Sequence, residues 1–399
     1  MAYGGEMTIR LQARRALALV LAAFVACPPA HALISLNEGR DRIFVTGTVS
    51  VSRDSNVFAN ADQKGDFLYS TTLSADYTRR NGWIGVNANA AVSSTRFGEI
   101  DGQDFDNPTL GLEFTKQTGR TTGSLTISAS RESRADASVN VRSTSWIIPV
   151  GLNFKYPIVG AWTATGSLGY SQRKYLDEVA FASLTSYSAS VDLIHILNTE
   201  REAVAGYRYR FSDTSRDTSS SDHNFSLGLN GKLLRGISGS ARVGYQFRSV
   251  ESPLRSDITY QSWTASVGAS YALSKKANLS ASVAKDFSIT ASDQIVDTTN
   301  ASLDFKYAYN SRWAFMAGVG YGDTRFLGEG GRIILDQGPP LLYGPNRHDN
   351  YFEWHATLSY SHSEHFKAML TYSWFKNWST LSYADFIRSS WTLTASTRW

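Results

Sequence analysis

The last nine residues, WTLTASTRW (391–399), carry the pattern that decides the fold. Trp391, Leu393 and Trp399 fall on one side of an extended chain, because successive side chains of a β-strand point to opposite faces. Ala395 and Thr397 share this face, and the residues of the other face, Thr392, Thr394, Ser396 and Arg398, are polar. A strand with one apolar, aromatic face and one polar face is typical of a wall that separates lipid from water.

The same alternation recurs through most of the chain. In 83–97, Ile84, Val86 and Val92 share one face, while Asn87 and Ser93 share the other. Alternation over ten or more residues suits a tilted membrane strand better than a strand of a soluble protein. Comparable apolar faces occupy 146–154, 203–211, 241–247, 263–271, 301–309, 313–321 and 352–360.

The segments between these strands alternate between short and long. Short turns are expected at 80–82, 118–120, 234–236, 274–276 and 310–312. Longer polar loops are expected near 53–64, 98–106, 133–143, 174–183, 212–222, 250–257, 290–297, 327–349 and 378–386. Nine long loops indicate nine hairpins, hence about 18 strands, with 16 as the alternative. An even number of strands places both termini of the chain in the periplasm.

We therefore predict an all-β protein, a transmembrane antiparallel up-and-down β-barrel over residues 43–399. Such a sheet must close on itself, because hydrocarbon offers no partner to the unpaired N–H and C=O groups of an open edge. Aromatic residues near strand ends would form girdles at the two interfaces. A large soluble β-structure, such as a propeller, is the alternative and leaves these lipid-type faces unexplained.

Composition agrees with a barrel and excludes other classes. The mean hydropathy of -0.25 is too polar for a helical membrane protein. After the N-terminus, no run approaches the ~20 apolar residues of a membrane-spanning helix. The net charge of +4 is small for 399 residues, so we expect no nucleic-acid partner.

The N-terminus is typical of an export signal. Arg10, Arg14 and Arg15 precede the apolar run 16–26, and Ala-His-Ala at 30–32 has the form of a cleavage site. We expect residues 1–32 to be a cleaved signal peptide and 33–42 to be a short periplasmic segment. An uncleaved anchor and a lipidated Cys27, the only cysteine, are the alternatives.

Charged residues on the polar faces are candidates for the lining of the lumen. These are Arg208, Arg210, Arg242, Arg248, Lys306, Asp304, Glu353 and His355. One interpretation is a basic strip that attracts anionic sugars or other anionic solutes. The other is that arginines and aspartates pair with one another and keep a wide barrel rigid.

Loop 327–349 is the longest of the expected loops. It combines glycines, a Pro339-Pro340 pair and apolar clusters, so it could fold into the lumen as a constriction or lie across the mouth without selecting solutes. No catalytic set, cofactor motif or metal cluster stands out, and we predict a non-enzyme without a cofactor or bound metal. His362 and His365 are more typical of a solvated turn than of a metal site.

The C-terminal strand resembles the sorting signal that the barrel assembly machinery of the bacterial outer membrane reads. Trp391, Leu393 and Trp399 are the matching residues, and Trp399 stands where that signal usually has Phe. The resemblance implies an outer-membrane location, with membrane lipid and the assembly machinery as partners.

The first expected loop contains Asp54-Ser55-Asn56 followed by Val57-Phe58, directly after a strand. A strand leading into this motif resembles the opening of the β-barrel porin 2 family, some of whose members accompany exopolysaccharide export systems. The resemblance implies a porin-like channel for saccharides, including secreted exopolysaccharide, with polysaccharide export components as further partners. For Asp54, Ser55 and Asn56 themselves, a turn is the simplest role. A structural barrel with a plugged lumen and partner-binding external loops is the alternative function.

Overall fold

The computed structural model describes residues 34–36, 41–79, 82–137, 139–252, 255–327, 332–333, 341–342 and 347–399. The expected signal peptide, residues 1–32, and most of loop 327–349 lie outside these described residues. Within them, eighteen antiparallel strands form a closed barrel, as the hairpin count predicts. The strands are β2 (Asp41–Asp54), β3 (Asp66–Arg79), β4 (Gly85–Phe97), β5 (Phe105–Lys116), β6 (Thr122–Asp136), β7 (Val141–Pro157), β8 (Trp162–Tyr175), β9 (Leu184–Asn198), β10 (Arg201–Thr214), β11 (Ser219–Leu234), β12 (Ile237–Ser252), β13 (Arg255–Ala272), β14 (Ala277–Ile289), β15 (Ile295–Ala308), β16 (Trp313–Leu327), β19 (His348–Ser361), β20 (Phe366–Ser379) and β21 (Phe386–Arg398).

The barrel closes where the first strand meets the last. β2 pairs with β21 from Thr46↔Arg398 to Asp54↔Ser390, and with β3 on its other edge. Trp399 extends this seam, because its N–H donates to the Val45 carbonyl at 2.8 Å and its carbonyl accepts from the Val45 N–H at 2.9 Å. Every wall strand therefore has a neighbour on both sides, which removes the edges that lipid cannot tolerate.

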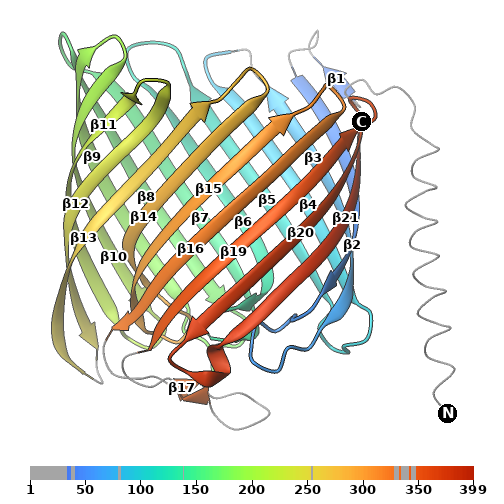
Figure 1. Cartoon of the computed structure of the whole chain (residues 1–399). Coiled ribbons are helices and arrows are strands. Elements are labelled where there is room, and N and C mark those ends of the chain that lie inside the picture. The colour runs from blue at the N-terminus through green and yellow to red at the C-terminus, as the bar shows by residue number, and fades with distance from the viewer. Residues whose placement is uncertain are drawn as a thin grey trace, which may run out of the picture.

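The two ends of the barrel differ (Figure 1). β1 (Ile34–Leu36), which pairs with the start of β2, lies at the same end as Trp399, together with the eight short turns between the described strands. The nine other connections lie at the opposite end, which we call the loop end, and include η2 (Ser382–Ala384) and the short pair β17 (Arg332–Ile333) and β18 (Leu341–Leu342). Several expected loops are shorter than predicted, because their polar ends extend the strands, as in 137–140 instead of 133–143.

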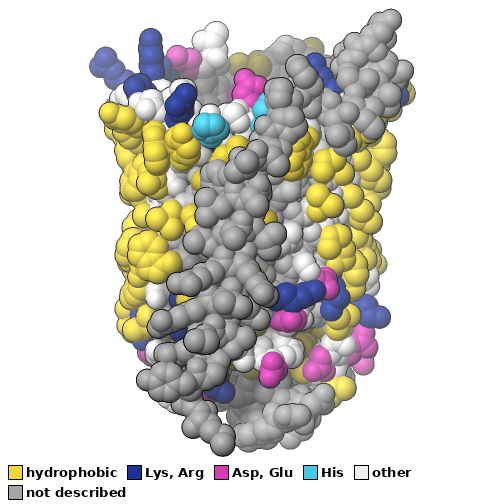
Figure 2. All heavy atoms as spheres, turned by 90° about the vertical axis from the view of Figure 1, so that its right-hand side faces the viewer, with side chains coloured by type: hydrophobic (Ala, Val, Ile, Leu, Met, Phe, Trp, Pro, Cys, Tyr) yellow, Lys and Arg dark blue, Asp and Glu magenta, His cyan; other side chains and the backbone are white. Residues whose placement is uncertain are grey.

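The outer wall is apolar between two polar rims (Figure 2). Leu227, Leu73 and Leu110 are each more than 60% exposed, as expected of side chains that face lipid. Tryptophans such as Trp83 and Trp263 lie near opposite ends of this band. Among the described residues, no helix has the length and apolarity needed to span a membrane.

Two hairpins part from a neighbouring strand at the loop end. β5 and β6 pair only up to Thr109↔Ser130, although β6 continues to Asp136. β14 likewise parts from β13 beyond Ala265↔Lys285, whereas β15 stays paired with β16 up to Ile295↔Leu327. We call the two segments at these separations the β6–β7 tip (131–144) and the β14–β15 tip (286–298).

β13 and β14 separate near the edge of the apolar band that faces the loop end. On β13, Trp263 is exposed beside the last paired residue, and the outward positions beyond it are Gln261, Thr259 and Asp257. The unpaired edge of β13 therefore faces water rather than hydrocarbon, where open edges are tolerated.

Candidate functional site

The β14–β15 tip folds against the inner face of β10–β13. Asp297, which has the same parity as the lipid-facing residues of β15, accepts hydrogen bonds from Lys285 at 2.5 Å and from the inward Ser262 of β13 at 3.0 Å. Phe287 lies under Arg248 of β12, with 5.4 Å from the guanidinium to the ring centre. The outer face of the tip thus covers the inner face of the wall.

An ion-pair network holds this tip in place. Asp222 on β11 accepts hydrogen bonds from Arg210 at 2.6 Å and from Arg248 at 2.5 and 2.7 Å. Asp286 on β14 accepts from Arg208 at 2.8 Å and from Arg210 at 3.4 Å. Asp222 and Arg248 are essentially fully buried, so each charge depends on these partners.

Arginine-to-carbonyl hydrogen bonds reinforce the network. Arg210 donates to the Phe287 carbonyl at 2.9 Å, and Arg248 donates to the Ser288 carbonyl at 3.2 Å. These carbonyls belong to residues that β13 no longer pairs. The arginines therefore bond the backbone of the segment of β14 that has lost β13 as a neighbour.

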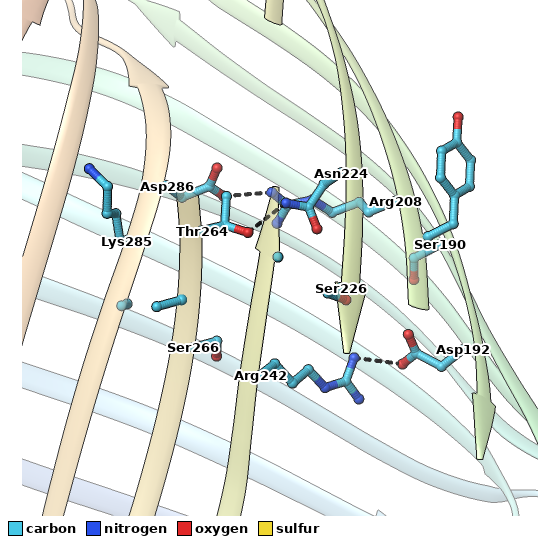
Figure 3. A pocket seen from close by; sticks show the side chains of 14 residues that line it. Ser190, Asp192, Arg208, Asn224, Ser226, Arg242, Thr264, Ser266, Lys285 and Asp286 are labelled. Carbon is cyan, nitrogen blue, oxygen red and sulfur yellow. Dashed lines mark hydrogen bonds and ion pairs between the residues drawn. The ribbon is translucent and has the colours of Figure 1, made fainter. Parts of the chain in front are cut away.

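A cavity of about 370 Å³ lies next to this network, on the side away from the loop end. Figure 3 shows Arg208 directed at Asp286, Arg242 at Asp192, and Asn224 bonded to Thr264. The Arg242–Asp192 ion pair has an N–O distance of 2.8 Å.

All four arginines expected in the lumen therefore point inward and have carboxylate partners. The geometry matches the interpretation in which arginines pair with aspartates. Among the arginines of β10–β13 whose side chains the structure describes, the four predicted ones therefore form no unpaired strip that would attract anions.

The β6–β7 tip reaches across part of the mouth to the β2–β3 connection. Asn140 donates to the Ala59 carbonyl at 2.9 Å, and Arg142 donates to the Val57 carbonyl at 3.4 Å. Both acceptors belong to the β2–β3 connection, several strands away around the barrel. The tip therefore narrows the mouth from the inside.

Arg347 ties this tip to the end of loop 327–349. Its buried guanidinium bonds Asp349 at 2.6 Å and donates to the Asn140 side-chain oxygen at 3.2 Å and the Ala137 carbonyl at 3.1 Å. The ring of Phe326 lies 4.3 Å from its charged carbon. Most of loop 327–349 lies outside the described residues, so both expectations for it, a constriction in the lumen and a loop across the mouth, stay predictions.

An apolar cluster forms where the two tips meet. Val139 of one tip and Ala291 of the other pack with buried residues of the β8–β9 connection, and Tyr383 packs against them. The Ala182 N–H donates to the Ala291 carbonyl at 2.8 Å. Burial raises the pKa of Tyr383, so its phenol stays neutral in this setting.

The motif Asp54-Ser55-Asn56 forms a turn and also joins the barrel seam. The Asp54 carboxylate accepts the Asn56 N–H at 2.9 Å and a bidentate pair from Arg388 of β21, with the shortest distance 2.6 Å. Ser55 accepts from the Ser389 N–H at 2.8 Å. The motif thus fastens the first strand to the last at the loop end.

Glu353 and His355 lie on β19, three strands along the wall from β14 of the arginine network. They line a cavity of about 460 Å³ together with Phe375, Phe386 and Arg388, and Ala135 and Ala137 of the β6–β7 tip contribute to its lining. The rings of Phe375 and Phe386 stack with their centres 5.5 Å apart. Nε2 of His355 lies 3.7 Å from Oδ1 of Asp304 on β15, and Lys306 lies two residues further along that strand.

A third cavity lies beside the β6–β7 tip, on the side away from the Glu353 cavity. It has a volume of about 550 Å³ and is lined by Arg134, Asp136 and Arg173 on one side and by the β14–β15 tip on the other. The two cavities flank the constriction, so the tips narrow the lumen and leave space beside them.

Sequence reasoning identified the inward charges but missed the elements that gather them. Asp222 and Asp286 complete the arginine network, and the β6–β7 tip forms the constriction. The sequence pattern predicts a polar loop over 133–143 and does not reveal a hairpin that turns inward. Glu132, Arg134 and Asp136 at alternate positions were the available signal.

The residues of the proposed sorting signal lie on the outer wall. Trp391 and Leu393 are exposed there, and the ring of Trp391 packs on Tyr372 with centres 4.6 Å apart. Trp399 closes the seam through its backbone, as described above.

Comparisons with solved structures identify the same class of fold. The FrpB iron transporter from Neisseria meningitidis is 10% identical, with 87% of this chain and 63% of that chain covered and a TM-score of 0.51. This chain thus spans less than two thirds of the length of FrpB. Pseudomonas aeruginosa OpdK, solved with vanillate, is 10% identical (90% and 99% covered, TM-score 0.48), and OccK2 from the same species is 12% identical (90% and 97%, TM-score 0.48).

No family model matches the chain, and no curated protein sequence matches it. The likeness to FrpB shows the fold, a closed β-barrel of the outer-membrane kind. Together with the apolar band and the polar lumen, it assigns the chain to the bacterial outer membrane.

Proposed function

We propose that this barrel is a porin-like channel for saccharides. The observation that carries the proposal is the 460 Å³ cavity beside the constriction, where aromatic rings lie next to Glu353, His355 and Arg388. Its volume falls within the range of about 300–1,000 Å³ typical of small-molecule sites. Sugars present both apolar ring faces and many hydroxyls, and this lining offers partners for both.

The inner wall adds hydroxyl groups along the barrel. Ser373 and Ser390, which line the same cavity, bond each other at 2.8 Å, and Ser167–Ser190 and Ser282–Ser302 form similar cross-strand pairs. Each hydroxyl keeps acceptor capacity for a passing solute. Such a wall favours weak, repeated contacts, which suit conduction better than tight binding.

The resemblance of Asp54-Ser55-Asn56 to the β-barrel porin 2 family supports a more specific proposal. The cargo would then be a secreted exopolysaccharide, delivered by periplasmic polysaccharide export components. A constriction flanked by two cavities suits one saccharide strand rather than a bundle. The proposed role is passive and assigns no catalytic step to the chain.

The plugged-barrel function remains the second candidate, and one observation favours it. The buried apolar cluster around Val139 and the fully buried Arg347 give the mouth a packed interior of its own. If this packing is permanent, the barrel serves as a structural or partner-binding element.

Single-channel recording separates the two functions. The purified full barrel is inserted into planar lipid bilayers, and we expect stepwise conductance that maltooligosaccharides reduce in a concentration-dependent way. Absence of conductance with all loops intact would remove the channel and leave the plugged barrel. Conductance that saccharides do not affect would keep the channel and reject this cargo.

A further inference from the structure

Three glycines on β16 create a notch in the inner wall. Gly318, Gly320 and Gly322 occupy alternate positions that face the lumen, opposite His355, Glu353 and Tyr351 of β19. A Cβ at Gly320 would lie 2.7 Å from the Glu353 carboxylate, and Cβ atoms at Gly318 and Gly322 would overlap the His355 and Tyr351 rings. The missing side chains let the three β19 side chains lean across β16 toward β15.

Tyr351 and His355, which flank Glu353 on β19, have partners on β15. The Tyr351 hydroxyl donates to the Asn300 side-chain oxygen at 3.0 Å, and His355 approaches Asp304 at 3.7 Å. The ring of Tyr351 also stacks on Phe375 with centres 5.3 Å apart. Both neighbours of Glu353 are therefore held in place.

Glu353 itself has no such partner. Across Gly320 in register lies Ser302 of β15, whose hydroxyl already pairs with Ser282 at 2.8 Å. In the part of the chain that the structure describes, no hydrogen bond or ion pair reaches the Glu353 carboxylate, and the residue is exposed to the lumen. The guanidinium in the same cavity, Arg388, is engaged by Asp54.

We propose that the Glu353 notch binds the ammonium group of an amino sugar, an inference that rests on the proposed saccharide channel. The carboxylate would accept charge-assisted hydrogen bonds from the ammonium. The adjacent tyrosine ring offers its negative face to the same cation. Asp304, the next inward residue after Ser302 on β15, adds a second carboxylate. Lys306 is the inward residue after Asp304 and lies farther from the loop end.

The test compares glucosamine, N-acetylglucosamine and glucose at a pH where the amine is protonated. Titration calorimetry of the purified barrel measures binding, and bilayer recording measures block of the current. We expect only glucosamine to bind measurably, and E353Q to weaken its binding by about tenfold or more, because a hydrogen bond to a charged group contributes about 1.5–3 kcal/mol. The matched control, E113Q, removes a lumen carboxylate on β5 and leaves glucosamine binding unchanged.

The outcomes distinguish the site from the channel. Glucosamine binding that depends on Glu353 without any conductance keeps the site and removes the channel. Equal binding of all three sugars, or binding that survives in E353Q, overturns the site even if the barrel conducts. Rescue by E353D, which restores the charge, supports the carboxylate as the recognising group.

Discussion

Asp222 shows how single residues hold the interior of this barrel. Its carboxylate is buried between two arginines, and both would lose a partner if it were neutralised. Breaking one member of a buried ion-pair network is costly because it leaves uncompensated charge behind. Asp54 plays a comparable role at the seam, where its partner Arg388 is partly exposed and solvent weakens the pair.

Replacing Asp222 should therefore weaken the barrel. We expect D222N to lower the free energy of unfolding by about 3 kcal/mol, measured by denaturant unfolding of the refolded barrel in lipid. D213N, on an exposed position of β10, should change it by less than about 0.5 kcal/mol. Equal effects of the two substitutions would contradict the role given to the network.

A smaller loss of stability is expected for a substitution at the seam between β2 and β21. D54N should cost about 1 kcal/mol, because the charged pair with the partly exposed Arg388 is lost while an amide oxygen can still accept the Asn56 N–H. The readout is the temperature at which the folded band is lost in semi-native gel electrophoresis. D62N, in the same connection, serves as the control, and a D54N barrel as heat-stable as D62N would argue against a fastening role.

At the scale of elements, alternation predicted the wall strands well and the hairpin tips poorly. Parity alone placed Arg208, Arg210, Arg242 and Arg248 inside, because it depends only on neighbouring residues. Asp286 could not be assigned as their partner, since it lies on a strand that leaves its neighbour. Whether a hairpin stays in the wall depends on contacts between distant segments, such as Asn140 with Ala59, which a local pattern does not contain.

Shortening the β6–β7 tip should widen the pore. Replacing 133–143 by a short glycine-serine turn removes contacts to the β2–β3 connection and leaves the wall pairing up to Ser130 intact. We expect single-channel conductance to rise severalfold. Deleting 101–103 from the β4–β5 connection at the same end should leave conductance unchanged. If the shortened tip conducts like the wild type, the constriction lies elsewhere.

For the whole molecule, closure through Trp399 is the feature that sequence anticipated most directly. The count of eighteen strands followed from the hairpin period, and the shared end of β1 and Trp399 followed from the even count. The cavity that supports the proposed cargo could not be predicted from the sequence. It combines strands that are far apart in the sequence with a hairpin tip that turns inward.

The terminal residue offers a test of assembly. We expect W399A to reduce the fraction of the protein that reaches the outer membrane, while W399F retains it, if the assembly machinery reads a C-terminal aromatic residue. Membrane fractionation after expression measures both. Normal insertion of W399A would show that the backbone pairing with Val45 suffices.

The separation of the two tips from the wall has a consequence for how the barrel fluctuates. Segment 131–136 pairs with β7 alone, whereas wall residues are paired on both sides. Cooperative units with fewer neighbours open at lower free energy than the global unfolding. Amide hydrogen exchange should therefore be faster in the tips than in the wall strands. The tips would open and close many times while the wall stays folded, so the width of the passage is an average over these movements.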